Sequence, residues 1–417
     1  MNSRTIMHID VNSAFLSWQA AYNKQIGIKE DIRDIPAVIG GDISSRRGIV
    51  LAKSIPAKKV GIKTGESLFE ARLKCKNLKV IPPNYDLYVR SSKAFRKLLS
   101  EYSPKIEVFS IDECFMDYTG LEGYFGDAVN IAYKMKERIY KELGFTVNIG
   151  ISTNKLLAKM AGELHKPDKV DTIYPHEVSK KLWPLSVGEL FMVGRRTKKK
   201  LNKIGIQTIG DLANSDYEFI SSVLKSHGRL IHQYAWGRDA SPVRSNDDIP
   251  FKSVGNGSTI SFDVCDRRTA HLIILSLIET ASKRLRKANM QTSLIYVGIK
   301  NGDFAYRSHQ RKIYTPTNVT IEIYEIAKEI FDEIWDGIPL RQFTVRLCDI
   351  SSAQFSQLSI FNKENHDKNS ALDNVVDKIR DKYGKNSLKR GVFVNSELKH
   401  MIGGVGSDEY SMMSSIL

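Results

Sequence analysis

Three carboxylates are the residues of this 417-residue chain best suited to hold a metal ion. Asp10 closes the apolar run of HIDVNSAF, and Asp112 and Glu113 stand side by side in SIDECF. Mg²⁺ favours oxygen ligands, taking one or two carboxylates from the protein and the rest from water and phosphates. Three carboxylates would suit a two-metal site, whose ions clamp the attacking and leaving oxygens of a phosphoryl transfer. The alternative is that all three are ordinary surface charges at strand ends.

Short strands must carry these acids. Residues 6–11 and 108–115 read as strands, and residues 145–151 as a possible hairpin partner of the second. Residues 129–143 lie between them and have apolar side chains at helical spacing. Successive strand side chains point to opposite faces, so the two neighbouring acids of SIDECF can share one site only if the strand ends or turns there. The pattern predicts an α+β sheet covered by helices.

The remaining segments differ in their pattern of apolar, polar and turn-forming residues. Residues 36–38 and 48–52 are two further strand candidates, separated by turn-forming residues. From about residue 171 short helices are broken by Pro and Gly, and the polar residues 245–253 look like a linker. A second α/β pattern follows, with strands expected near 295–300 and 343–348 and helices near 270–289 and 321–335. After residue 350 polar sequence leads into an amphipathic helix with one apolar face, formed by Leu372, Val375, Val376 and Ile379.

The charge balance narrows the class of partner. The chain has 62 Lys and Arg against 47 Asp and Glu, a net charge of +15 that attracts nucleic acid or an anionic membrane. The longest strongly apolar stretch, residues 272–278, is far shorter than the roughly 20 residues of a spanning helix. The N-terminus has no apolar signal-peptide core, and the four cysteines form no CxxC pair. We therefore expect a cytoplasmic protein with no membrane partner.

Five segments carry a family resemblance: HIDVNSAF, VLAKSIPAKKVGIKTGE, PPNYDLYVRSS, SPKIEVFSIDECFMDYTG and NIGISTNKLLAKMAGELHKP. In order and spacing they resemble the bacterial Y-family translesion DNA polymerases, the DinB/UmuC-like group that copies damaged templates. The resemblance runs from about residue 5 to 361. It implies a multidomain α+β polymerase right hand, with a palm of mixed sheet plus helices, small fingers, a helical thumb with a helix-hairpin-helix, and an α/β little finger.

The resemblance also implies domain boundaries. We expect a catalytic palm at 1–20 and 81–170, fingers at 21–80, a thumb at 171–244, a linker at 245–253, a DNA-binding little finger at 254–349 and a C-terminal tail at 350–417.

The activity that the resemblance implies is template-directed DNA synthesis, with dNTPs inserted opposite damaged bases of a primer-template. Asp10, Asp112 and Glu113 match the family's catalytic, metal-binding carboxylates, and the Val11 carbonyl its backbone ligand. Two Mg²⁺ ions per active site are implied, one activating the primer 3′-OH and one stabilising the leaving pyrophosphate.

Four residues match the family's nucleotide site. Phe15, five residues after Asp10, matches the steric gate, whose ring occupies the space of a ribose 2′-OH; the alternative is a core aromatic. Ser54, Lys58 and Lys166 match positions that hold the incoming triphosphate.

The triphosphate site departs from the family pattern. Ile55 and Lys58 stand where the family often has Tyr and Arg, and Lys offers a point charge where Arg offers a bidentate fork. Looser triphosphate binding, or compensation by other groups, would follow. Lys155 and Lys159 are further candidates to line the site, with surface charge as the alternative.

The segment VGRRTKKKLNKIGIQTIGDL resembles the helix-hairpin-helix of the family's thumb. In that motif a glycine turn exposes backbone N–H groups to phosphate. The usual first turn glycine is Met192 here, so a less regular hairpin is expected; a solvated basic helix face is the alternative. The expected DNA-binding residues are Gly194, Arg195, Arg196, Lys198, Lys199 and Lys200. In the little finger, Lys283, Arg284, Arg286 and Lys287 lie on a candidate helix.

A docking peptide is expected in the polar stretch after residue 350. The residues Gln357, Leu358, Ser359, Ile360 and Phe361 read QLSIF and resemble the pentapeptide that binds the bacterial sliding clamp. Its apolar side chains would enter a pocket of the partner, and packing on the chain's own tail is the alternative. The resemblance also implies UmuD-like or RecA-like accessory proteins as candidate partners and association with the nucleoid.

Two rival functions stay open from the sequence. One is a catalytically silent DNA-binding scaffold of the same fold, and the other a nucleotidyl enzyme such as a cyclase on a similar palm. Within the family, the internal position of QLSIF, with NYDLY and VGRRTKKKL, lies nearer the UmuC-like branch than the DinB-like one, and the branch stays open.

Overall fold

The computed structural model describes residues 4–41, 48–245, 252–353, 366–394, 396, 398, 400 and 401. Backbone contacts divide the chain between Ile249 and Pro250, within the segment expected to be a linker, into an N-terminal unit and a C-terminal unit. Within the described ranges, no helix combines the length and the apolar character needed to cross a membrane.

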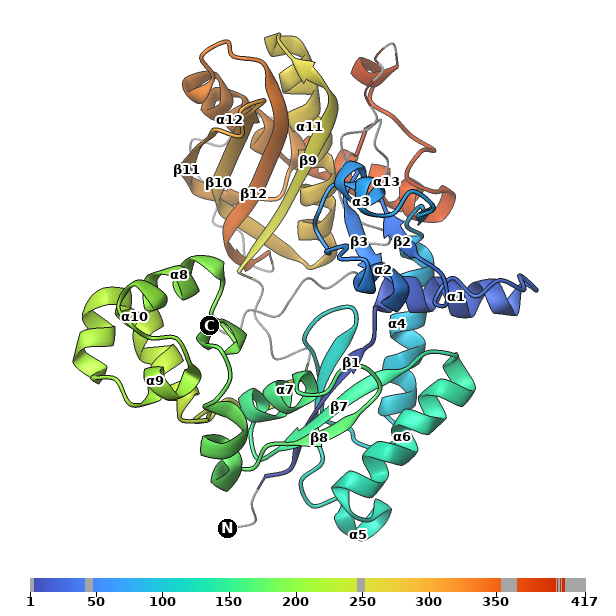
Figure 1. Ribbon diagram of the computed structural model, residues 1–417. Coiled ribbons are helices and arrows are strands. Elements are labelled where there is room, and N and C mark those ends of the chain that lie inside the picture. Colours follow the sequence, from blue (N-terminus) through green and yellow to red (C-terminus); the bar gives the residue numbers. More distant parts are fainter. Residues whose placement is uncertain are drawn as a thin grey trace. The chain divides into compact units, whose positions relative to one another are not determined.

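The N-terminal unit is built on a five-stranded sheet (Figure 1). Its order is β5-β6-β1-β7-β8, with bounds β5 (Ile106–Val108), β6 (Glu113–Asp117), β1 (Ile6–Val11), β7 (Val147–Ser152) and β8 (Val170–Thr172). β1 pairs antiparallel with both β6 and β7, so the strand that ends near Asp10 runs through the middle of the sheet.

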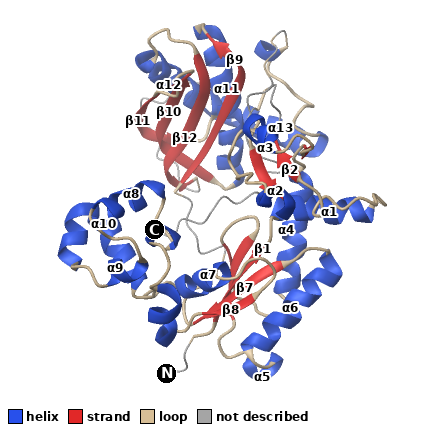
Figure 2. Ribbon diagram, in the orientation of Figure 1, coloured by secondary structure: helices blue, strands red, loops and turns tan. Residues whose placement is uncertain are grey.

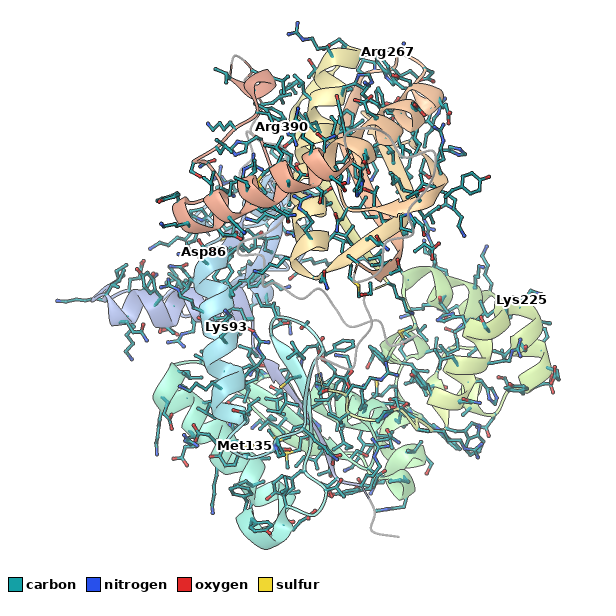
Figure 3. The ribbon with its side chains drawn as sticks, turned by 180° about the vertical axis from the view of Figure 1, so that it is seen from behind. Asp86, Lys93, Met135, Lys225, Arg267 and Arg390 are labelled. Carbon is teal, nitrogen blue, oxygen red and sulfur yellow. The ribbon has the colours of Figure 1, made fainter. Side chains whose placement is uncertain are left out.

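Helices cover both faces of this sheet (Figure 2). Met7, Ile9 and Val11 of β1 point to the face covered by α1 (Ala14–Gln25), α4 (Tyr85–Leu99) and α6 (Ala128–Leu143). Figure 3 shows two of these helices from behind, with Lys93 labelled on α4 and Met135 on α6. The alternate residues of β1, which include Asp10, face α7 (Lys155–Glu163).

Two glycines allow α7 to lie directly on β7. A Cβ atom at Gly150 of β7 would stand 2.0 Å from the Ala158 carbonyl oxygen and 2.3 Å from the Gly162 nitrogen, both of α7. No larger residue fits at Gly150 without moving the helix. This close contact places Lys159 of α7 beside Glu113 of β6.

Two strand predictions need correction. Residues 108–115 are not one strand: β5 and β6 form a hairpin, and its turn contains Asp112. The backbone N–H groups of Phe109 and Ser110 both donate to the Glu113 carbonyl, which closes the turn. Residues 147–152 form β7 as expected, but β7 pairs with β1 and not with β6, because β1 lies between them. The helix predicted at 129–143 is confirmed as α6.

A small second sheet and a helical region complete the N-terminal unit. The sheet has the order β3-β2-β4 and packs with two short helices, with bounds β2 (Ala37–Gly40), β3 (Val50–Lys53), α2 (Ile55–Lys59), α3 (Leu68–Lys74) and β4 (Lys79–Ile81). The short helices expected after residue 171 are present: α8 (Arg195–Lys203), α9 (Ile209–Ala213), α10 (Tyr217–Ala235) and brief turns η1 (Pro175–Glu177), η2 (Val178–Leu182) and η3 (Val187–Glu189). A short α5 (Glu122–Phe125) precedes α6.

The C-terminal unit is a four-stranded antiparallel sheet of order β11-β10-β12-β9. Its elements are β9 (Ser253–Val264), α11 (Arg267–Lys287), β10 (Met290–Asn301), β11 (Tyr306–Thr317), α12 (Thr320–Ile334) and β12 (Leu340–Ser352). The predicted strands and helices are confirmed, whereas β9 and β11 were missed. β11 is mostly exposed and polar, so it has no apolar alternation to reveal it.

The helix predicted after residue 350 exists as α13 (His366–Tyr383), but its buried face is not the expected one. Leu372 and Val375 are both 53% exposed, whereas Asp373 and Arg380 are buried. α13 therefore docks on α11 by its charged face, while of the predicted apolar face Val376 and Ile379 are half-buried and Leu372 and Val375 are exposed.

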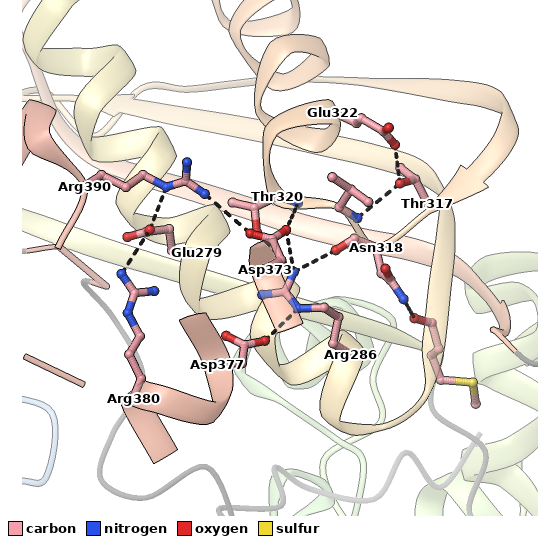
Figure 4. Close-up of polar contacts among 12 residues, drawn as sticks. Glu279, Arg286, Thr317, Asn318, Thr320, Glu322, Asp373, Asp377, Arg380 and Arg390 are labelled. Carbon is pink, nitrogen blue, oxygen red and sulfur yellow. Dashed lines mark hydrogen bonds and ion pairs between the residues drawn. The ribbon is translucent and has the colours of Figure 1, made fainter. Parts of the chain in front are cut away.

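Figure 4 shows the charge network between the two helices. Arg286 of α11 pairs with Asp373 at 3.1 Å and with Asp377 at 2.7 Å. Glu279 of α11 accepts from Arg380 at 3.3 Å, and from Arg390, which follows α13, at 2.8 Å. Lys283 pairs with Asp381 at 2.6 Å. Lys283 and Arg286, expected among the cations of a DNA-binding helix, are used here to hold α13.

Replacing Arg286 by Met should destabilise the C-terminal unit by about 3 kcal/mol, because Asp377 loses its ion pair and the buried Asp373 is left with its 3.5 Å pair with Arg390. Urea unfolding monitored by circular dichroism would measure this loss. Lys312→Met is the matched control, since its pair with Asp349 is exposed and 3.6 Å long and should contribute under about 1 kcal/mol. Equal midpoints for the two variants would contradict a structural role of the network.

Candidate active site

The end of β1 and the β5–β6 turn bring the three predicted carboxylates together. Asp10 and Glu113 are direct cross-strand partners in the β1–β6 ladder. The Val11 N–H donates to the Asp112 carbonyl at 3.0 Å, which fixes the turn against β1. The Ser110 hydroxyl donates to Asp112 Oδ1 at 2.5 Å. The strand does turn between Asp112 and Glu113, which is the condition for both acids to serve one site.

Two lysines near α7 neutralise part of this acidic cluster. Lys159 Nζ donates to Glu113 Oε2 and lies over the rings of Phe109 and Phe191, 5.2 Å and 5.5 Å from their centroids. Lys166 Nζ donates to Asp10 Oδ2 and to Glu163 Oε1, the latter at 2.7 Å. Sequence reasoning expected Lys166 near the triphosphate and left Lys159 open, and the structure places both beside the acids.

The three acids differ in protonation tendency. Burial raises the pKa of Asp10 and outweighs the lowering effect of the Lys166 charge. Burial also raises the pKa of Asp112, against the hydrogen bond from Ser110. Burial acts on Glu113 in the same direction, but the hydrogen bond from His8 and the Lys159 charge prevail and lower its pKa to about 2. The Glu113 carboxyl group is therefore ionised at mildly acidic and neutral pH. Asp10 and Asp112 keep their protons to higher pH than ordinary aspartates do.

A divalent cation should bind this site more tightly as pH rises. Because the pKa values of Asp10 and Asp112 are raised, protons compete with the cation at mildly acidic pH, and this competition ends above those raised values. Titration with Mn²⁺ by electron paramagnetic resonance at a series of pH values would measure the change. An affinity that is level from mildly acidic to neutral pH would contradict the raised values.

The donor set fits Mg²⁺ bound with help from substrate. Carboxylate oxygens are the hard ligands that Mg²⁺ prefers, and it usually keeps several waters or phosphate oxygens. Among the residues with described positions, no group of three or more His, Cys, Asp or Glu side chains is placed to hold a metal ion. The fit to Mg²⁺ therefore rests on the chemistry of the carboxylates and on the strand pairing that sets Asp10 beside Glu113.

Phe15 lies at the start of α1 and is held by other aromatic rings. It stacks on Tyr88 of α4, with ring centroids 4.5 Å apart and planes 7° apart, and meets Tyr85 edge-on at 6.1 Å. Tyr88 is fully buried, whereas Phe15 is only half-buried. Phe15 thus presents a partly exposed ring on a rigid support. Sequence reasoning missed the support, although NYDLY holds both tyrosines at helical spacing.

Lys58 of α2 and Ser54, which caps this helix, were both predicted to bind triphosphate, but they differ in exposure. Lys58 is exposed. The buried Ser54 hydroxyl donates to the Ile35 carbonyl at 2.7 Å and accepts from the backbone N–H groups of Ala57 and Ala37, both at 3.1 Å. Ser54 therefore acts as the cap of α2, with its hydroxyl hydrogen already used, and its contact with a nucleotide stays a prediction.

The structure adds one lysine, Lys53, to the candidates for the nucleotide site. It removes another candidate, Lys155. Burial and the nearby charge of Lys58 lower the pKa of Lys53, so the two lysines form a local positive centre. Lys155 is buried and bonds both oxygens of Glu107 at 2.8 Å, which makes it part of a structural ion pair.

The short turn η3 precedes the segment expected to form a helix-hairpin-helix, which contains the helix α8. Gly194 caps its N-terminus, and Arg195, Arg196, Lys199 and Lys200 are exposed while Lys198 is half-buried. Met192 has φ +72°, the left-handed conformation that glycine usually supplies, and His227 bonds its carbonyl oxygen at 3.1 Å. The turn therefore forms despite the missing glycine.

The open face of the C-terminal sheet carries aromatic and basic residues that sequence reasoning missed. Ile295 and Val297 of β10 point into the core beneath α11 and α12, so Tyr296 and Lys300 lie on the opposite face. Tyr296 bonds the Tyr306 hydroxyl at 2.9 Å, and Arg346 lies 5.3 Å from the Tyr296 ring. The QLSIF peptide, residues 357–361, lies outside the described residues.

Comparison with known proteins now defines the class. A model of the impB/mucB/samB family matches residues 9–163, and one of its C-terminal domain matches residues 251–360. The structure also resembles a Y-family DNA polymerase chimera, Dbh-Dpo4(243-245)-Dbh, with TM-score 0.72 at 24% identity, over 84% of this chain and 99% of that chain. The chain belongs to the impB/mucB/samB family and has the Y-family polymerase fold.

The curated relatives specify the activity. The chain is 48% identical to DNA polymerase IV of Clostridium acetobutylicum over 95% of this chain and 100% of that protein. It is 37% identical to DNA polymerase IV of Acetivibrio thermocellus over 94% and 98% of the two chains. It is thus a translesion DNA polymerase of the DNA polymerase IV kind, which is DinB-like. The leaning toward the UmuC-like branch is wrong, and neither the silent scaffold nor the cyclase is supported.

Proposed function

We propose that Asp10, Asp112 and Glu113, with the Val11 carbonyl, hold two Mg²⁺ ions where β1 ends and β6 begins and form the catalytic centre of this polymerase. The observation that carries the proposal is the cross-strand pairing of Asp10 with Glu113, with Asp112 fixed beside them by its carbonyl bond to Val11. When bound, such ions increase the acidity of a primer 3′-OH and balance charge on the leaving pyrophosphate.

The lysines provide the phosphate-binding part of the centre. Lys166 already spans Asp10 and Glu163, so it can exchange its Asp10 contact for a phosphate oxygen without leaving the site. Lys58 and Lys53 supply positive charge from the small second sheet and α2. Together the two lysines compensate for the bidentate contact that is lost because Lys58 replaces the family's usual Arg. Ile55 is 51% exposed and adds no hydrogen bond.

The half-buried ring of Phe15 acts in this proposal as the sugar gate. Because Tyr88 backs it, the ring cannot retreat from a 2′-hydroxyl group. A deoxyribose is accepted in the same position because it has only hydrogen there.

Two surfaces hold the DNA in this proposal, one formed by a basic helix and the other by an open sheet face. The exposed cations of α8 contact phosphates, with backbone N–H groups of the Gly194 turn beside them. The open sheet face of the C-terminal unit adds Tyr296, Lys300 and Arg346. In domain terms we propose a palm at 1–20 and 81–170, fingers at 21–80, a thumb at 171–244, a linker at 245–253, a little finger at 254–349 and a tail at 350–417.

The sliding clamp is the proposed protein partner, through QLSIF at residues 357–361. Leu358→Ala with Phe361→Ala should abolish co-elution with clamp and leave primer binding unchanged, because the apolar anchors of such peptides carry most of the affinity. Clamp binding by the double variant would contradict the assignment. UmuD-like and RecA-like partners, and action on the nucleoid, stay predictions.

Primer extension tests the catalytic assignment. On a template with an abasic site and on its undamaged counterpart, the protein should extend a primer with Mg²⁺ and dNTPs, and chelation should stop it. Asp112→Asn should bind the same primer-template and not extend it. Extension by this variant at the wild-type rate would overturn the proposed centre.

A further inference from the structure

His8 lies directly beneath the catalytic centre and has no part in the function proposed so far. It precedes Asp10 by two residues on β1, so both side chains lie on the face covered by α7. The imidazole is fully buried, and its ring centroid lies 4.9 Å from that of Phe115. Burying a polar ring costs free energy that an apolar residue in the same space would not cost. A histidine at this position is therefore expected to have a specific role.

His8 contacts the carboxylate of Glu113 through Nε2, and the same nitrogen lies 3.5 Å from Lys159 Nζ. Nε2 lies 2.8 Å from Glu113 Oε2, and since a carboxylate only accepts, Nε2 carries the hydrogen and donates it. Lys159 donates to the same oxygen. In the described part of the chain, the side-chain contacts of Glu113 thus fall on Oε2, which leaves Oε1 as the oxygen available to a cation.

The second ring nitrogen of His8, Nδ1, gains no hydrogen bond from the described residues that pack around it. Nδ1 is buried and has no hydrogen-bond partner among the described residues. It faces the backbone of α7 at Gly162, where an added Cβ would stand 3.3 Å from it. The chain therefore keeps an unsatisfied nitrogen in its core while it keeps the bond from Nε2 to Glu113.

We propose that His8 is a positioning residue for metal binding: by holding Oε2, it fixes the carboxylate plane of Glu113 so that Oε1 points at the cation. The proposal rests on the proposed function, in which Glu113 is a metal ligand. Hydrogen-bond partners behind a ligand orient it, and their loss typically lowers metal affinity about 10–100-fold. His8 itself does not bind the metal, since Nε2 is occupied by Glu113 and Nδ1 faces α7.

The test compares three substitutions by Mn²⁺ titration with electron paramagnetic resonance, in the full-length protein bound to primer-template DNA. His8→Leu removes the donor, His8→Asn leaves an amide too short to reach Glu113, and His8→Gln keeps a donor of similar reach. We expect the first two to weaken Mn²⁺ binding about tenfold and His8→Gln to restore it to within about threefold of wild type. DNA affinity should not change in any of them.

Each outcome decides a different question. Wild-type Mn²⁺ affinity in His8→Leu or His8→Asn would overturn the role of His8. Equal loss in the Asn and Gln variants, with unchanged thermal unfolding midpoints, would also overturn it, because a donor of similar reach would then fail to restore metal binding in a protein whose packing is intact. If the Leu variant does not fold, the Asn and Gln pair alone gives the answer. Glu113→Gln is measured alongside: unaltered Mn²⁺ binding there would reject the proposed metal site itself.

Discussion

Primer extension by Glu113→Gln or Asp112→Asn should be at least about 10³-fold slower than by the wild type, with DNA affinity within about twofold. Each substitution keeps the shape of the side chain and removes one negative charge from the metal site. Metal ions contribute several kcal/mol to the stabilisation of a phosphoryl-transfer transition state, and each 1.36 kcal/mol is a factor of ten in rate. Rapid-quench measurement of a single dNTP insertion gives the rate, and fluorescence anisotropy gives the DNA affinity.

The matched control for these two variants is Asp86→Asn. Asp86 is an exposed carboxylate at the start of α4, in the same unit as the site (Figure 3). It carries the same chemical change without a place among the proposed ligands, so its insertion rate should equal that of the wild type. A comparable loss in Asp86→Asn would show that net charge, and not metal binding, controls the rate.

Phe15→Val should raise the use of ribonucleotides, relative to deoxyribonucleotides, by roughly 10–100-fold. Forcing an extra group against a well-packed side chain costs about 1–3 kcal/mol, and each 1.36 kcal/mol corresponds to a factor of ten. The stacked support of Tyr88 makes Phe15 such a side chain. Single-nucleotide insertion with matched rNTP and dNTP measures the ratio.

Two further variants separate the gate from its support. Phe15→Tyr keeps the ring and should keep the sugar selectivity. Tyr88→Leu removes the stacked ring behind Phe15 and should relax the selectivity by a smaller factor than Phe15→Val. Unchanged selectivity in Phe15→Val would remove Phe15 from the gate and return it to the core aromatics.

The catalytic acids could be predicted because their signal is local. Asp10 closes an apolar run, the acids of SIDECF interrupt one, and the neighbouring motifs identify the family without any knowledge of the fold. The hairpin around Asp112 could not be predicted, because Val108, Phe109 and Ile111 continue the apolar pattern through the turn. What closes the turn is the pair of backbone bonds to the Glu113 carbonyl, and the pattern of side chains does not encode them.

Long-range contacts are the larger part of what the sequence did not reveal. The bond from His8 to Glu113 spans 105 positions, and the stack of Phe15 on Tyr88 joins two helices. α13 shows the opposite failure: its apolar residues predict a hydrophobic face, but the matching charges of α11 and α13 decide which side is buried. Complementarity between two elements cannot be read from either of them alone.

Iron-directed cleavage of the backbone tests the central claim most directly. Fe²⁺ bound in place of Mg²⁺ generates hydroxyl radicals with peroxide and ascorbate, and these cut the chain next to the metal. We expect cuts within a few residues of Asp10 and of Asp112, suppressed by excess Mg²⁺ and absent in Asp112→Asn. Cuts elsewhere in the chain, or undiminished cuts in the variant, would contradict a metal site where β1 ends and β6 begins.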